Sequence, residues 1–173
     1  PQLASSLNNF NQNFQLVPHW TAEQLTALHQ LGLRNDDWFG ETALWDQRTF
    51  RQTVIRRYAP WLVLLRPAIN LVARLTDKPA LPAAGETLSH AFVSHLTTTD
   101  LSLLNHLRTS AAQRGIEWLT VGFATNDPRL PLIRQYFHCR EYRSRLYIVR
   151  WPGLGGAASD LDHRILAPEV ALL

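Results

Sequence analysis

Between residues 88 and 151, the hydrophobic and polar positions predict three strands that alternate with two helices. Residues 88–96 alternate loosely, as a strand does, and residues 116–123 are short, apolar and β-branched, which is typical of a buried strand. Residues 142–149 alternate strictly, so their side chains should point to the two faces of a sheet in turn.

The two segments between these strands carry helix signals. Asp100 can cap a helix N-terminus, and Leu104 and Leu107 follow it at helical spacing. Asn126 is a second candidate cap, and Pro128 suits the first position of the helix that follows. The order strand, helix, strand, helix, strand predicts an α/β (α+β) fold, with a mixed, mostly antiparallel sheet flanked by helices.

The N-terminal half of the chain has a helical pattern in two places. Thr21 and Gln24 match a capping box at the start of a short helix. Residues 47–76 keep helical spacing over a longer stretch, which Pro60 and Pro67 should kink or split because each removes a backbone donor.

Composition divides the chain into three parts. Residues 1–13 are rich in Asn, Gln and Ser and predict a linker or extension, and residues 152–173 predict a C-terminal tail. Residues 14–151 are expected to form one domain, with residues 47–76 as a helical insert. Because the chain lacks methionine and begins with Pro1, we expect a longer polypeptide, with an N-terminal partner domain or a second copy of the chain as its partner.

Charge and cysteine content indicate which ligands and which cellular compartment to expect. The chain has 17 Lys and Arg against 14 Asp and Glu. This surplus suits a phosphorylated ligand or a solvated surface, and nucleic-acid binding is not expected unless the arginines share one face. Cys139 is the only cysteine, which fits a reducing, cytoplasmic compartment. The apolar run 61–75 is short and contains Arg66, so no membrane partner is expected.

Two common classes of catalytic site lack their motifs. The seven histidines are scattered, and neither a CxxC nor an HExxH pattern occurs, so no metal site is expected. No GxSxG motif indicates a serine hydrolase.

The region from residue 88 to 151 resembles the C-terminal half of the GNAT superfamily of N-acetyltransferases, as a divergent bacterial member. The resemblance rests on AFVSHL, the helix after Asp100, EWLTVGF, Asn126 with the helix to Tyr136, and SRLYIV. In that family a strand faces the pantetheine arm of acetyl-CoA, the next helix N-terminus holds the pyrophosphate, and a second strand splays from the first. The resemblance implies acetyl transfer from acetyl-CoA to a small-molecule or peptide amine by direct attack.

The resemblance also implies roles for particular residues. Tyr136 would protonate the leaving thiolate, and Glu117 or His95 would take the proton of the amine. The coenzyme A contacts would come from Phe92, Val93, Ser94, His95, Leu96, Thr97, Thr98, Thr99, Asp100 and Asn126.

One departure from the family leaves a second interpretation open. The pyrophosphate loop of the family has the form Gln/Arg-x-x-Gly-x-Gly/Ala, whereas this chain has Thr97 to Asp100 there and no glycine. Glycine lets a phosphate approach the free N–H groups of a helix N-terminus closely. The alternative is therefore a degenerate, non-catalytic GNAT-like half that serves as a structural or dimerisation domain of a longer protein.

Overall fold

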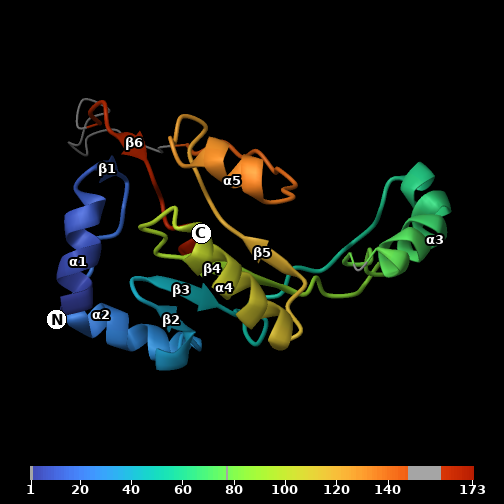
Figure 1. Ribbon diagram of the computed structural model, residues 1–173, viewed down its shortest axis with the longest axis horizontal. Helices are drawn as coiled ribbons and strands as arrows, with labels where there is room; N and C mark the ends of the chain where they lie inside the picture. The colour runs from blue at the N-terminus through green and yellow to red at the C-terminus, as the bar shows by residue number, and fades with distance from the viewer. Residues whose placement is uncertain (1, 77, 148–160) are drawn as a thin grey trace, which may run out of the picture.

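The computed structural model describes residues 2–76, 78–147 and 161–173 (Figure 1). The helices are α1 (Gln2–Asn11), α2 (Ala22–Ala27), α3 (Pro60–Leu75), α4 (Leu101–Gln113) and α5 (Leu130–Tyr136). The strands are β1 (Phe14–Gln15), β2 (Trp38–Phe39), β3 (Thr42–Trp45), β4 (His90–Ser94), β5 (Trp118–Thr120) and β6 (Ile165–Leu166). Short 3-10 helices cover Leu28–Leu31 (η1), Asn35–Asp37 (η2) and Val170–Leu172 (η4).

The main sheet has four strands in the order β2-β3-β4-β5. β3 is antiparallel to both β2 and β4, whereas β4 and β5 are parallel and are connected through α4. β1 and β6 form a separate parallel pair. The predicted α+β class, with a mixed and mostly antiparallel sheet and flanking helices, is therefore confirmed.

Strand alternation separates the core into two clusters, one on each face of the sheet. Trp45 and Phe92 belong to the cluster that contains residues of α1 and α2. Leu44, Ala91 and Val93, their neighbours along the strands, belong to the cluster with α4 and α5. Because successive side chains of a strand point to opposite faces, two adjoining strands supply both clusters.

Two predicted helix starts are confirmed by their hydrogen bonds. The Thr21 hydroxyl accepts from the Gln24 N–H, and the Gln24 side chain accepts from the Thr21 N–H, as in a capping box. The Asp100 side chain accepts from the N–H of Ser102 at the start of α4. α4 is followed by Gly115, whose φ of 66° is in the left-handed region that glycine adopts readily.

Three segments before residue 148 differ from what the sequence pattern predicted. Residues 2–11, expected as a linker or extension, form α1, and Ala4 and Leu7 are buried in the core. Residues 138–147 form neither helix nor strand, so the strand expected over residues 142–149 is absent from 142–147, and its last two residues lie outside the described part. Within the predicted helical insert, helix begins only at Pro60.

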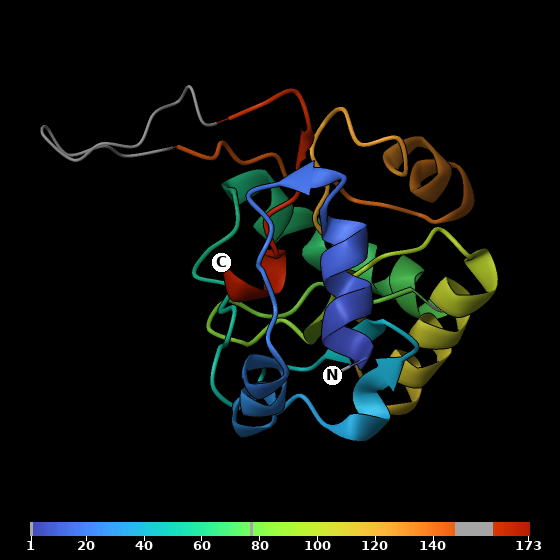
Figure 2. The same ribbon diagram turned by 90° about the vertical axis from the view of Figure 1, so that its left-hand side faces the viewer.

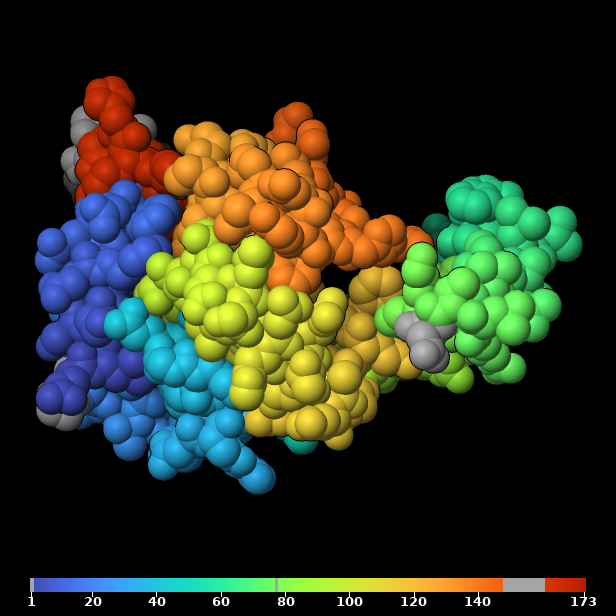
Figure 3. All heavy atoms as spheres, viewed as in Figure 1, coloured from blue at the N-terminus to red at the C-terminus, as the bar shows by residue number. Residues whose placement is uncertain are grey.

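α3 projects from the rest of the molecule (Figures 1 and 3). Its inner face contacts the segment that follows it: Arg66 Nε and Asn70 Nδ2 both donate to the carbonyl oxygen of Leu81. Its outer face exposes Trp61, Leu64, Leu65, Leu71, Val72 and Leu75. Among the described residues, no helix has the length and apolarity needed to cross a bilayer.

The C-terminal residues return to the sheet. After β6, which lies beside β1, the chain runs back to the main sheet, where η4 contacts β4 (Figures 1 and 2). Ala171 is buried in the same cluster as Trp45 and Phe92. Residues 161–173, which were expected to be a tail, are therefore part of the packed structure.

Candidate functional site

The candidate site lies where β4 and β5 part. Their parallel pairing runs from His90 with Trp118 to Phe92 with Thr120, whereas the pairing of β3 with β4 continues as far as Ser94. The last residues of β4 therefore extend beyond the point at which β5 pairs with them. Crevices at the carboxyl ends of neighbouring strands are common ligand sites in α/β sheets.

The segment Pro168–Leu172, which we call the closing segment, fills this place. A Cβ atom built on Gly122, two residues after β5, would lie only 1.8 Å from Val170 Cγ2. On the other side, the Glu169 carboxylate accepts a hydrogen bond of 2.8 Å from the backbone N–H of His95. The closing segment thus contacts the chain just beyond both strands.

Little free volume remains around the closing segment. A cavity of about 60 Å³ is bounded by residues after β4 and β5, by the closing segment and by the α1–β1 region. Its lining includes Trp20, His95, Gly122, Arg129 and Glu169. Such a cavity can hold a few water molecules, but it is well below the ~300 Å³ of ordinary small-molecule sites.

His95 is the most unusual residue of this site. Its φ of 55° is in the left-handed region, which non-glycine residues seldom adopt and which is often associated with functional sites. Its ring lies 4.8 Å from the Trp20 ring and 5.0 Å from the Trp38 ring, centroid to centroid. Its Nδ1 contacts the Ser94 hydroxyl at 3.0 Å, and its Nε2 is buried without a hydrogen-bond partner among the described residues.

Burial sets the charge of this imidazole. It lowers the pKa of His95 to about 4, because the charged form loses its hydration. His95 is therefore neutral near pH 7. In the tautomer with its proton on Nδ1, the free Nε2 can accept a hydrogen bond from a ligand that reaches it, and a pKa of about 4 makes it a weak base.

Two carboxylates near the cavity have opposite pKa shifts. Burial raises the pKa of Glu169 and outweighs the hydrogen bonds from the His95 and Ala171 N–H groups. Burial also opposes ionisation of Asp127, but hydrogen bonds from the side chain and backbone of Arg129, together with its charge, lower the pKa of Asp127 overall. Asp127 is thus the ionised partner of Arg129.

Arg129 connects several segments around the cavity. Its guanidinium lies over the rings of Phe10, Phe14 and Phe123, with centroid distances of 5.0–5.5 Å. It also donates to the Leu96 carbonyl oxygen at 2.6 Å. These contacts and the ion pair with Asp127 occupy the guanidinium, so Arg129 has a structural role and is not an anion-binding residue.

The predicted pyrophosphate loop is already capped by the chain itself. Thr97, Thr98 and Thr99 are partly buried, and the Thr98 hydroxyl accepts from the Asp100 N–H at 3.0 Å. The Asp100 carboxylate then accepts from the backbone N–H and the hydroxyl of Ser102, both at 2.8 Å. A phosphate at this helix N-terminus would have to displace a carboxylate of the same charge.

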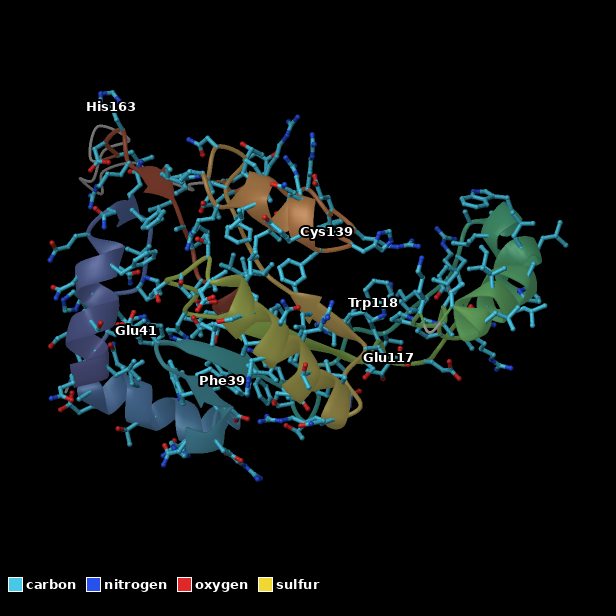
Figure 4. All side chains as sticks on the ribbon, viewed as in Figure 1. Phe39, Glu41, Glu117, Trp118, Cys139 and His163 are labelled. Carbon is cyan, nitrogen blue, oxygen red and sulfur yellow. The ribbon has the colours of Figure 1, made fainter. Side chains whose placement is uncertain are left out.

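The structure brings some predicted site residues together and separates others. Phe92, Val93, Ser94 and His95 lie at the end of β4 beside the closing segment, and Leu96 lines the same cavity. Glu117 is exposed just before β5, near the start of the parallel pair, so it lies at the opposite end of the strands from His95 (Figure 4).

The two remaining predicted residues come from the region of α5. Asn126 is exposed in the turn before α5, and Tyr136 is the last residue of α5 with 55 % of its surface exposed. Neither side chain lines the cavity at His95.

Sequence reasoning missed the residues that close the site. Gly122 lies within a predicted strand, where it could have indicated a close approach of another chain segment. Glu169 and Val170 lie in a segment interpreted as a tail, and nothing in their local pattern indicates a long-range partner. Gln47, whose side-chain amide donates to the Ala171 carbonyl oxygen at 2.8 Å, was likewise unremarked.

Among the described residues, no group of three or more His, Cys, Asp or Glu side chains could hold a metal ion. Comparisons with protein-family models, with curated proteins and with solved structures found no match to this chain.

Proposed function

We propose that this chain is an acyl-CoA-dependent N-acyltransferase of the GNAT type, which transfers an acetyl group from acetyl-CoA to a small-molecule or peptide amine. The observation that supports the proposal is the β4–α4–β5 unit. Its two strands are parallel, stop pairing after Phe92 and Thr120, and are connected by a helix that begins shortly after β4. The GNAT resemblance implies such a splayed pair of strands around the pantetheine arm.

His95 is the residue best suited to act on an amine. Acetyl-CoA would supply an already activated acyl group, so the protein's own residues need only align the amine and accept its proton. His95 lines the cavity at the strand ends, and its buried Nε2 has no hydrogen-bond partner in the described part of the chain. Tyr136 as the acid and Glu117 as a second base belong to the proposal, but their exposed side chains lie away from this cavity.

Coenzyme A does not fit the conformation described. The cavity of about 60 Å³ is too small for a pantetheine arm, and Asp100 occupies the backbone N–H of Ser102 at the start of α4. Binding therefore requires that the site open.

A second candidate is a non-catalytic, GNAT-like half that serves as a structural or dimerisation domain. The same filled site favours it, together with the separation of Glu117 from His95 along the parallel strands. The two proposals differ in one measurable property, because a structural half has no affinity for coenzyme A.

Coenzyme A binding tests the proposal directly. A ligand present at a hundred times its dissociation constant stabilises a protein by about 2.7 kcal/mol, which raises Tm by several degrees in a chain of this size. We expect such a rise with coenzyme A, and release of free thiol from acetyl-CoA when a panel of amines is added. No rise in Tm at millimolar coenzyme A, and no thiol release, would leave the structural alternative.

His95, the residue after β4, can be tested against a matched variant at the start of that strand. We expect His95→Asn to abolish amine-dependent thiol release, because it removes the proton acceptor while Asn tolerates the left-handed backbone. His90→Asn, at the other end of β4, should leave most of the release. Equal loss in both variants would indicate damage to the strand and would remove the catalytic role of His95.

A further inference from the structure

The closing segment Pro168–Leu172 occupies the position at which the proposed ligand would have to bind. We infer that it is a displaceable internal ligand, which closes the site between the ends of β4 and β5 and leaves when an acyl-CoA binds. That the incoming ligand is an acyl-CoA rests on the proposed function. That the closing segment fills the site rests on the contacts described below.

At Gly122 the chain leaves just enough space for the Val170 side chain of the closing segment. Because a Cβ there would lie 1.8 Å from Val170 Cγ2, any other residue would collide with the Val170 side chain. The backbone of Gly122 does not adopt the left-handed conformation that would by itself favour glycine. The glycine is therefore explained by the space that Val170 occupies.

Polar groups hold the closing segment on its other side. The Glu169 carboxylate accepts from the N–H of His95, and the Ala171 carbonyl oxygen accepts from Gln47 Nε2 at 2.8 Å and from Arg51 Nη1 at 3.4 Å. Departure of the segment would free these donors and open the cavity next to the His95 ring. A ligand with carbonyl acceptors could then take the same donors.

The anchoring is limited enough for the segment to leave. Within the closing segment only Ala171 is fully buried, and the preceding β6 pairs with β1 through two residues. Burial of the Glu169 carboxyl raises its pKa, so holding it ionised in this place costs free energy. Because the closing segment belongs to no strand of either sheet, it can detach without separating paired strands.

The closure can be tested in the full chain without any ligand by hydrogen exchange with mass spectrometry. Val170→Asp would place a charge against the packed strand ends, and we expect faster exchange at the His95 amide and across residues 165–172. Leu173→Asp is the matched control, because it adds the same charge to an exposed side chain one residue beyond the segment. Equal exchange in the two variants would overturn the closure.

A compensating pair tests the contact from the side of the sheet. Gly122→Ala should expel Val170 and also speed exchange of residues 165–172. Gly122→Ala combined with Val170→Gly should restore slow exchange, because the second change returns the lost space. If Gly122→Ala leaves exchange unchanged, the closing segment does not dock as inferred.

Coenzyme A titration then separates this inference from the proposed function. We expect the dissociation constant of Val170→Asp to be at least about tenfold lower than that of the wild type, with Leu173→Asp equal to the wild type. Binding of equal strength to all three would overturn displacement. Absence of binding to all three, with faster exchange in Val170→Asp, would support the closure and contradict the acyl-CoA function.

Discussion

The Glu169 carboxylate accepts a hydrogen bond of 2.8 Å from the backbone N–H of His95, 74 positions earlier in the chain. This bond joins the closing segment to the residue that follows β4. It also connects two groups of the site, Glu169 and His95, whose pKa values are both shifted by burial toward the neutral form. The pH dependence of stability should therefore report on this part of the molecule.

Glu169 should make the fold less stable as pH rises. Its pKa is raised in the folded chain, so its contribution is fully present below the ordinary glutamate value of about 4.5 and is lost as pH rises through the raised pKa. Glu169→Gln keeps an acceptor for the His95 N–H but does not titrate. We expect the free energy of unfolding of the wild type, relative to this variant, to fall with rising pH in urea titrations. Parallel profiles would show that Glu169 is not buried in solution.

His95 should act in the opposite direction. Its pKa falls from about 6.5 to about 4 on folding, so its contribution is fully present above pH 6.5 and is lost as pH falls toward 4. The full shift corresponds to about 3 kcal/mol. The charged groups that line the same cavity are the Glu169 carboxylate, which accepts from the His95 N–H, and Arg129.

The test for His95 is urea unfolding of the wild type and His95→Asn between pH 7 and pH 4. The wild type should lose stability over this range relative to the variant, which cannot titrate. His19→Asn is a suitable control, because His19 is exposed. A wild-type profile that runs parallel to that of His95→Asn would contradict the burial of the imidazole.

The Asp127–Arg129 ion pair should be costly to break from one side. The Asp127 side chain is fully buried, and Arg129 Nη2 lies 2.7 Å from its Oδ2. Arg129→Met would leave a buried carboxylate without its cation, and we expect a loss of about 3–5 kcal/mol in the free energy of unfolding. The double variant with Asp127→Asn should lose less than the sum of the two single variants. Additive losses would indicate that the two side chains do not interact.

Local sequence patterns predicted the elements that are determined by residues close together in the sequence. The capping box of Thr21 and Gln24 and the cap at Asp100 depend on residues within three positions, and both are present. The strand over residues 88–96 and the apolar spacing of Leu104 and Leu107 are likewise reproduced by β4 and α4. These are signals that a short window contains in full.

The remaining features depend on residues far apart in the sequence, which a local pattern does not show. In residues 1–13 the polar composition concealed α1, whose Leu7 belongs to one buried cluster with Trp20 and residues of the sheet. Residues 142–147 alternate strictly but pair with no strand in the described structure. Without a neighbouring strand, an alternating segment gains no hydrogen bonds of a sheet. The closing of the site by Val170 needed knowledge of Gly122, 48 positions away.

The outer face of α3 provides the last test, because α3 exposes more large hydrophobic side chains than any other described helix. Leu64 on this face is 81 % exposed, whereas Leu107 of α4 is completely buried. Leu64→Gln should change the free energy of unfolding by less than about 0.5 kcal/mol, since no neighbour loses a packed contact. Leu107→Ala should cost about 2–5 kcal/mol, because it leaves a cavity in the core. Urea unfolding measures the free energy of unfolding of both variants. A loss above about 1 kcal/mol for Leu64→Gln would mean that this face of α3 is covered in solution.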